Sequence, residues 1–330
     1  MKRRAFFKQA AAGLAAGAVA APALAQSQPT VSWRVASSFP KSLDTIFGGA
    51  DIIARLTAQK LSDRLNQRFI VDNRVGGSGL VGTRAAIRSA PDGYTLFFGH
   101  TGSISINPSL YANSGFDPRK DFTAIGMFAS MPVAILAHPT FEPKTVGDFI
   151  ALAKKEGGKM NIGTSAVGTG GYLSAELFKS MTGIEAVLVP YKGTAPLMND
   201  LLGGHVKVAF GVLPPAMGNL AAGTLRGMAV LDRQRFSLLP DVPTAHESGL
   251  PGFESVLHYG LLGPAGLPRP IVDKLNAALK AAATTDEVKK RINNEGGDPM
   301  TSTPEEYARD IDQEETKWGT LIRKLNLKVE

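Results

Sequence analysis

Residues 73–83 read NRVGGSGLVGT, and residues 91–96 read PDGYTL. This order of residue types predicts the end of a strand, a glycine-rich turn, a helix, a tight turn and a second strand. A turn of this kind points the unpaired N–H groups of a helix start toward whatever lies above them, and such a site suits an anion. The stretch therefore predicts one unit of an α/β protein that carries an anion-binding turn.

The rest of the chain continues this alternation of short apolar runs with helical patterns. The helical stretches place apolar residues three and four positions apart, as in Leu173, Leu177 and Met181. Such alternation predicts an α/β fold with mainly parallel sheets and flanking helices. The predicted strands are 31–37, 69–71, 95–98, 133–137, 161–164, 186–189, 206–210 and 225–230.

The length of the chain predicts two lobes, because about 300 residues exceed one comfortable core. Apolar strand-like runs flanked by glycine or proline, at 126–133 and 253–263, are the expected crossovers between the lobes. The first lobe would hold residues 26–130 and 254–330, and the second would hold residues 131–253. Two α/β lobes joined by two crossovers form a hinge, with the ligand cleft between the strand ends.

The last helix has a clear start signal in residues 303–306 (TPEE), with a hydroxyl at the N-cap, proline in the first turn and glutamate three residues on. An apolar stripe follows at helical spacing and predicts that this helix packs on the core. The stripe consists of Tyr307, Ile311, Trp318, Ile322 and Leu325.

The first 25 residues have the pattern of an export signal rather than of folded structure. Residues 1–8 (MKRRAFFK) are basic, an Ala/Gly-rich apolar run follows, and residues 23–25 (ALA) form a cleavage site. The arginine pair before two phenylalanines resembles a twin-arginine signal, and an ordinary secretory signal is the alternative. We therefore expect cleavage after Ala25 and a mature protein in the periplasm.

Composition narrows the function classes. The chain has no cysteine, which excludes disulfides, cysteine metal ligands, a thiol nucleophile and a lipid-modified cysteine. The formal charge of +7 falls to +3 when Lys2, Arg3, Arg4 and Lys8 leave with the signal. No basic block, nucleic-acid motif or membrane-spanning apolar run follows, so we expect a soluble protein without a nucleic-acid partner.

The first turn also matches the G-x-G-x-x-G pattern of dinucleotide-binding sites, through Gly77, Gly79 and Gly82. Those sites need an acidic residue about twenty positions further on, and residues 99–102 (GHTG) offer none. A nucleotide cofactor is therefore not expected. Two interpretations remain, a structural glycine turn and a turn that lines a carboxylate cleft.

A second glycine-rich turn, residues 163–172 (GTSAVGTGGY), follows one predicted strand and opens a predicted helix. Ser165 and Thr169 can donate through their hydroxyls, and the N–H groups of residues 168–171 would point into the cleft. Two such turns facing each other would hold a carboxylate with neutral donors. A hydrolase serine is disfavoured because the sequence is G-x-S-x-V rather than G-x-S-x-G.

Two further side chains sit at predicted strand ends. His100 is either a cleft contact or a solvated loop residue, and Tyr191 either contacts a ligand or covers the core. The chain has five histidines, but none has metal-ligand spacing, so no metal is expected.

Taken together, these features resemble the tripartite tricarboxylate transporter substrate-binding receptors, also called the Bordetella uptake gene family. The resemblance covers about residues 51 to 320. It implies a two-lobed Venus-flytrap fold that binds a small organic carboxylate in the periplasm and delivers it to a membrane permease of two integral subunits. Besides the two opening stretches, the runs that carry it are DIIAR (51–55), FDP (116–118), VPYKG (189–193), LPDVPT (239–244), GPAG (263–266) and STPE (302–305).

The resemblance also assigns the carboxylate-holding loops to Ser38-Phe39 and to residues 165–170. The sequence departs from the family after its first strand, where residues 41–47 (KSLDTIF) replace a short P-P-G-G-x-x-D turn. Residues 33–41 (WRVASSFPK) instead resemble the start of the tripartite ATP-independent periplasmic receptors, which also bind carboxylates. The longer loop is expected to change the volume of the pocket.

We therefore predict a monomeric binding protein with its ligand cleft between two lobes and without a cofactor, metal or catalytic residue. The alternatives are a sensor subunit that signals carboxylate occupancy to a membrane kinase and, with less support, a periplasmic hydrolase or isomerase that uses His100 or Ser165. Gly211 is included because the family often has an acidic or polar residue there. The predicted ligand-binding residues are Ser38, Phe39, Gly79, His100, Thr101, Ser165, Gly168, Thr169, Gly170, Tyr191, Gly193 and Gly211.

Overall fold

The computed structural model describes residues 33–37 and 49–329. The strands are β1 (Trp33–Ser37), β2 (Phe69–Asn73), β3 (Thr95–His100), β4 (Phe122–Ala137), β5 (Asn161–Thr164), β6 (Val187–Pro190), β7 (Val208–Val212), β8 (Arg226–Val230), β9 (Val256–Pro264) and β10 (Asp298–Pro299). The helices are α1 (Gly49–Leu65), α2 (Leu80–Ile87), α3 (Asn107–Leu110), α4 (Pro118–Asp121), α5 (Val146–Glu156), α6 (Gly170–Thr182), α7 (Thr194–Leu202), α8 (Met217–Ala221), α9 (Arg269–Ala283), α10 (Asp286–Asn294) and α11 (Pro304–Lys324), with short helical turns η2 (Gly77–Gly79), η3 (Gly102–Ile106) and η4 (Pro214–Ala216).

The strands form a sheet in the order β2-β1-β3-β9-β4-β7-β5-β6, and β8 and β10 also pair with β4. Pairing is parallel among β1, β2 and β3 and among β5, β6 and β7. In contrast, β9 is antiparallel to β3 and β4, and β4 is antiparallel to β7 and β8. The predicted α/β class is confirmed, but the sheet is mixed rather than mainly parallel. The reason is that β4 and β9 carry the chain outward and back between the two parallel ends, so they run in opposite directions.

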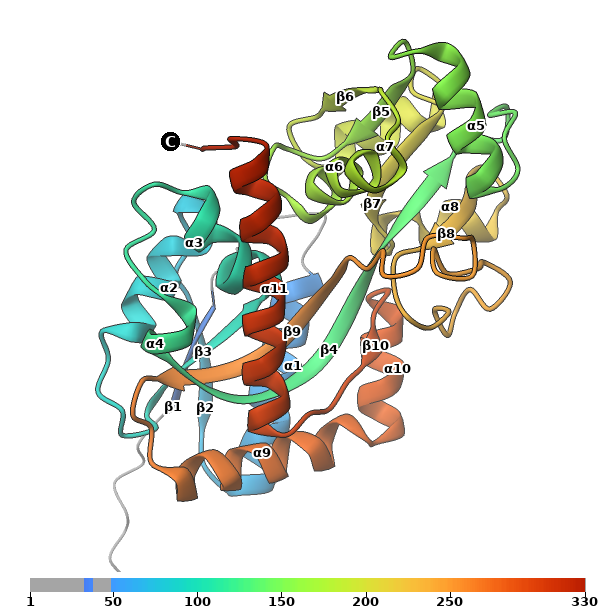
Figure 1. Cartoon of the computed structure of the whole chain (residues 1–330). Helices are drawn as coiled ribbons and strands as arrows, with labels where there is room; N and C mark the ends of the chain where they lie inside the picture. The colour runs from blue at the N-terminus through green and yellow to red at the C-terminus, as the bar shows by residue number, and fades with distance from the viewer. Residues whose placement is uncertain (1–32, 38–48, 330) are drawn as a thin grey trace, which may run out of the picture. The chain divides into compact units, whose positions relative to one another are not determined.

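The predicted strands lie within about two residues of the observed ones, with one exception. The run 133–137 is only the last part of β4, a strand that changes partners along its length. Residues 122–132 pair with β9, and residues 133–137 pair with β7. Figure 1 shows β4 and β9 side by side as the two strands that connect both ends of the sheet. The described residues pack as one unit, so the division into lobes stays a prediction.

Each end of the sheet has its own buried side chains. Around β4 and β9, α1 and α9 bury Ile53, Leu61 and Leu279 against the sheet. At the other end, four phenylalanine rings contact one another with centroids 5.1–6.5 Å apart. These rings belong to Phe149, Phe178, Phe210 and Phe253.

The predicted last helix is confirmed as α11. Its N-cap Thr303 accepts the N–H of Glu306 at 3.1 Å, and the Glu306 carboxylate accepts the N–H of Thr303 at 2.7 Å. Trp318, in the predicted apolar stripe, is 1% exposed. The helix runs alongside β4 and β9 to reach α3 and α6, as Figure 1 shows. None of the described helices combines the length and apolar character needed to cross a membrane.

Candidate functional site

A cavity of about 560 Å³ lies where the two glycine-rich turns meet. Its described lining comes from the turn after β2, from the end of β3 with η3 and α3, from the turn after β5, from the turn between β6 and α7, and from β7 and β9. Several predicted residues are brought together here. These are Gly79, His100, Ser165, Gly168, Thr169, Gly170 and Gly193.

Hydrogen bonds fix the turn that leads into α6. The hydroxyl of Thr169 donates to the carbonyl of Ala166 at 2.7 Å and lies 2.7 Å from the hydroxyl of Ser165. Because Thr169 has one hydroxyl proton, Ser165 must donate in that pair. The N–H groups of Gly170 and Gly171 occupy the first positions of α6, where a helix has no internal acceptors for them. This wall therefore offers backbone N–H donors at the positive end of a helix dipole.

The first glycine-rich turn does not offer the donors that its sequence predicts. The N–H groups of Gly79 and Val81 donate to the carbonyl of Gly76 at 3.0 and 3.4 Å, and that of Leu80 donates to Gly77. The turn closes on itself because residues 76–79 all have positive φ angles. The prediction of free N–H groups aimed at a ligand is therefore wrong for these three groups.

His100 enters the cavity wall as a neutral side chain. Its Nδ1 accepts the N–H of Gly102 at 2.7 Å, which assigns the ring proton to Nε2. Burial lowers the pKa of His100 from 6.5 to about 4, so the ring is uncharged near neutral pH. A neutral imidazole of this tautomer can donate a hydrogen bond to an anion.

Three predicted residues do not line the cavity. The hydroxyl of Thr101 is buried and accepts the N–H of His258 at 3.0 Å. The Tyr191 hydroxyl donates to Asp200 at 2.7 Å, and burial together with that carboxylate raises the pKa of Tyr191 to about 12. Gly211 lies in β7 and pairs with Ala134 of β4, and its neighbour Val212 lines the cavity instead. Ser38 and Phe39 lie outside the described residues.

Several residues of the cavity wall are not predicted from the sequence. Ser78 sits inside the opening stretch but carries no signal beyond its glycine neighbours. Asn107, Leu110 and Tyr111 follow η3 and have no local motif, while Leu257 belongs to β9. Only the packing of the chain brings them to the first turn. No lysine, arginine, aspartate or glutamate is found among the described lining residues.

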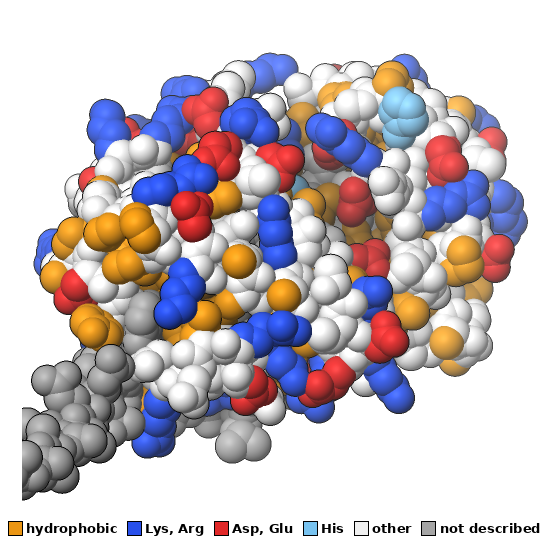
Figure 2. All heavy atoms as spheres, turned by 90° about the horizontal axis from the view of Figure 1, so that it is seen from below, with side chains coloured by type: hydrophobic (Ala, Val, Ile, Leu, Met, Phe, Trp, Pro, Cys, Tyr) orange, Lys and Arg blue, Asp and Glu red, His pale blue; other side chains and the backbone are white. Residues whose placement is uncertain are grey.

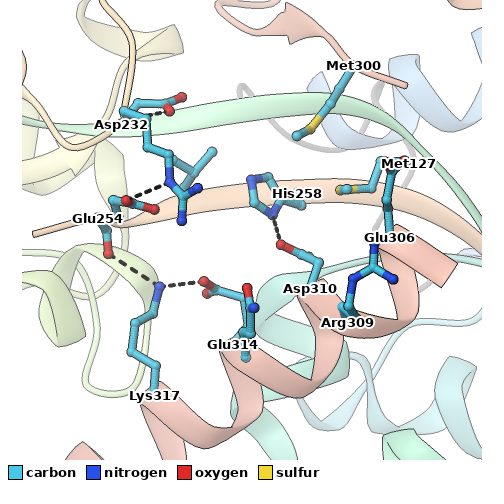
Figure 3. A pocket seen from close by; sticks show the side chains of 13 residues that line it. Met127, Asp232, Glu254, His258, Met300, Glu306, Arg309, Asp310, Glu314 and Lys317 are labelled. Atoms are coloured by element: carbon cyan, nitrogen blue, oxygen red, sulfur yellow. Dashed lines mark hydrogen bonds and ion pairs between the residues drawn. The ribbon is translucent and has the colours of Figure 1, made fainter. Parts of the chain in front are cut away.

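A second, charged cavity of about 270 Å³ lies on the other face of β9. Alternate residues of a strand face opposite sides, so Leu257 lines the first cavity whereas Val256 and His258 line the second. Figure 3 shows charged side chains of α11 facing those of the segment between β8 and β9. Arg233 pairs with Glu254 at 2.7 Å, and Lys317 Nζ donates to the Glu254 carbonyl at 3.3 Å.

His258 is the titratable centre of this charged cavity. The Asp310 carboxylate lies 2.8 Å from its Nδ1, an ion pair rather than a well-aligned hydrogen bond. Burial alone would lower the pKa of His258, but Asp310, with contributions from Glu314 and Asp232, raises that pKa above its ordinary value. The folded protein therefore favours the protonated ring.

Asp310→Asn should lower the unfolding free energy by about 2 kcal/mol at pH 6, and by progressively less as the pH rises to 9. The pKa of His258 is higher in the folded state than in the unfolded one. The stabilisation that protonated His258 contributes is therefore fully present below pH 6.5. It is lost as the pH rises through the pKa of His258 in the folded state. Urea unfolding of both proteins at four pH values measures this, above the range in which His100 titrates.

The matched control is Asp273→Asn, which removes an exposed ion pair with Arg269 on α9. It should cost little and show no comparable pH dependence. A cost of Asp310→Asn that stays constant from pH 6 to 9 would contradict the assigned ion pair.

The outer surface carries mixed charge. Figure 2 shows lysine and arginine side chains beside aspartate and glutamate side chains over one face of the molecule. No cluster of three or more histidine, aspartate or glutamate residues suited to a metal ion is present in the described part of the chain.

Comparisons with known proteins place this geometry in a family. The model of the tripartite tricarboxylate transporter family receptor matches residues 53–327. A relative from Agrobacterium vitis, the UPF0065 protein in the TAR-I ttuE-ttuC' intergenic region, is 35% identical over 80% of this chain and 78% of its own length. The solved structure of R. palustris Rpa4515 with adipate is 32% identical with a TM-score of 0.74, and the match covers 92% of this chain and 100% of that one. MatC from Rhodopseudomonas palustris with bound malate is 30% identical with a TM-score of 0.70, over 89% and 98% of the two chains. The predicted family and the predicted binding-protein fold are confirmed, and the chain belongs to the tripartite tricarboxylate transporter receptor family.

Proposed function

We propose that the protein is a periplasmic receptor that binds a small organic carboxylate and delivers it to a two-subunit membrane permease. The observation that carries the proposal is the cavity of about 560 Å³, whose described wall has neutral donors and no charged side chain. The start of α6 supplies positive partial charge, so an anion can be held there without a buried counter-charge. Family neighbours solved with adipate and malate make these two acids the first ligands to test.

We also propose that the two ends of the sheet act as lobes that close on the ligand. β4 changes its pairing partner after Pro132, and β9 begins at Val256, close to the predicted boundaries at 130/131 and 253/254. The residues that line the cavity come from both sides of this change in strand pairing. A ligand that contacts both walls would favour the closed arrangement by its greater affinity for it. Export by the twin-arginine route, cleavage after Ala25 and a monomeric state belong to the same proposal.

The hydrogen bonds of the cavity favour binding over catalysis. The Ser165 hydroxyl contacts Thr169 rather than a base, and Nδ1 of His100 contacts the backbone of Gly102. A serine nucleophile needs a base within hydrogen-bond reach and a third group that orients that base. Neither of these two contacts pairs the serine with a base.

Adipate or malate should raise the thermal unfolding midpoint of the purified protein in a concentration-dependent manner. A ligand at 100 times its Kd stabilises the folded state by about 2.7 kcal/mol, which is about 4 °C for a chain of this size. A thermal-shift series over ligand concentration measures this effect, and isothermal titration gives the Kd.

The control ligands are adipamide and 1,6-hexanediol, which keep the chain length of adipate and lack its negative charge. They should cause no shift. If no acid in a panel of mono-, di- and tricarboxylates changes the midpoint, or if an added acid is chemically consumed, the receptor proposal is wrong.

A further inference from the structure

Ser78 adopts a backbone conformation that few residues other than glycine accept. Its φ and ψ are 52° and 33°, and it stands between Gly77 and Gly79, which also have positive φ. A side chain in this left-handed region costs free energy that a glycine would avoid. A strained non-glycine residue at a cavity wall therefore suggests that its side chain has a use.

Two residues of the following segment fix Ser78 in place. The side-chain amide of Asn107, itself buried, donates to the Ser78 carbonyl at 2.9 Å. The Tyr111 hydroxyl donates to the Ser78 hydroxyl at 2.6 Å. One contact holds the backbone and the other holds the side chain, and all three residues line the same cavity.

The count of protons shows what the Ser78 hydroxyl can still do. Tyr111 has one hydroxyl proton and uses it on Ser78 Oγ. Ser78 Oγ therefore acts as an acceptor toward Tyr111 and keeps its own proton to donate. Within residues 33–37 and 49–329 no protein group accepts that proton. Ser78 is exposed at the cavity wall, so a ligand atom in the cavity can take the place of solvent there.

The wall around α6 is arranged differently. There the hydroxyl protons of Ser165 and Thr169 are both used within the turn, and backbone N–H groups remain as donors. The cavity thus has one set of donors from the backbone of α6 and one hydroxyl donor from the first turn. If the α6 donors hold one carboxylate of the ligand, Ser78 can donate to a second acceptor group.

We propose that Ser78, positioned by Tyr111, is a specificity-determining donor for the second carboxylate of the ligand, so that the receptor prefers dicarboxylates to monocarboxylates of equal length. The inference rests on the proposed function and adds the residue that discriminates between the two classes. Tyr111 acts through Ser78 and is a positioning residue.

The test compares two ligand pairs, adipate with hexanoate and malate with 2-hydroxybutyrate, by isothermal titration of the mature protein. The wild-type protein should bind each dicarboxylate more tightly than its partner. Ser78→Gly should weaken dicarboxylate binding about 10- to 100-fold and leave the monocarboxylates unchanged, because a hydrogen bond to a charged group is lost. Glycine accepts the backbone angles of this position, so the fold is preserved.

Two further variants separate the role of the hydroxyl from a general effect of substitution. Tyr111→Phe should reduce the preference for dicarboxylates about three- to tenfold, since Ser78 keeps its hydroxyl but loses its orientation. Ser89→Gly makes the same exchange at a serine whose hydroxyl donates to the Ala85 carbonyl instead, and it should leave all four affinities unchanged.

The outcomes distinguish the two proposals. If the wild-type protein binds none of the four acids or any other acid of the panel, the receptor function itself fails. If it binds acids but Ser78→Gly leaves the ratio of dicarboxylate to monocarboxylate affinity unchanged, the role of Ser78 is wrong and the receptor function stands. A wild-type protein that binds both members of each pair equally also overturns the role of Ser78.

Discussion

Replacing Gly168 with alanine is expected to weaken carboxylate binding about 100-fold while leaving the protein folded. Gly168 has a φ of 82°, and an added Cβ would lie 2.3 Å from Cδ2 of Leu110. The least costly relief is a shift of the turn away from α3, because the turn is short whereas Leu110 is fully packed. That shift would displace the N–H groups at the start of α6 from the cavity. Isothermal titration with adipate or malate measures the change.

Gly183→Ala is the matched control for backbone strain. Gly183 ends α6 with a φ of 67°, but an added Cβ there meets no atom within 4 Å. Its substitution should cost about 1 kcal/mol of stability and leave ligand affinity unchanged.

The double variant Gly168→Ala with Leu110→Ala should recover part of the affinity that Gly168→Ala loses, because the clash is then removed. If the ligand affinity of Gly168→Ala is within threefold of the wild-type affinity, the contact with Leu110 does not determine the shape of the cavity.

Trp318→Ala is expected to lower the unfolding free energy by about 3–5 kcal/mol, the largest stability effect that we predict. Trp318 is 1% exposed and packs in a cluster with α3 and α6. Its indole N–H donates to Glu314 at 2.7 Å, and Lys317 Nζ lies 4.6 Å from the ring centroid. Truncation leaves a cavity where three helices meet. Urea unfolding followed by circular dichroism, with linear extrapolation, gives the difference.

Two controls identify the source of this loss. Trp318→Phe keeps most of the buried aromatic surface and loses the hydrogen bond to Glu314, so it should cost about 1–2 kcal/mol. Leu238→Ala removes a large apolar side chain that is 45% exposed, and it should cost less than about 0.5 kcal/mol. If Trp318→Ala lowers the unfolding free energy by less than about 1 kcal/mol, the cluster contributes less to stability than its burial indicates.

The positions of most elements could be predicted because their signals are local. The run 161–164 matches β5 residue for residue, since a short strand between turn residues needs no distant contact to be recognised. Thr303 and Glu306 likewise form the predicted capping box of α11, because the box involves residues only three apart. The turn before α6, whose signals are also local, lines the cavity.

Pairing between distant segments could not be predicted in this way. The sequence predicts a crossover at 253–263, but the apolar residues of this run give no sign that β9 inserts between β3 and β4 in antiparallel register. Period-two or fully apolar patterns report burial and not strand direction. The charged cavity beside His258 follows from that insertion, because it needs α11 and β9 to lie together.

The sequence by itself determined the α/β class, the family, the capped last helix and the turn that starts α6, because each depends on residues close together in the chain. The tertiary structure alone decided that the Ser78 hydroxyl meets Tyr111 at the wall of the cavity. The partner of that hydroxyl, Tyr111, lies 33 positions further along the chain. A hydrogen bond over such a separation is set by how helices pack on the sheet, and no local propensity encodes it.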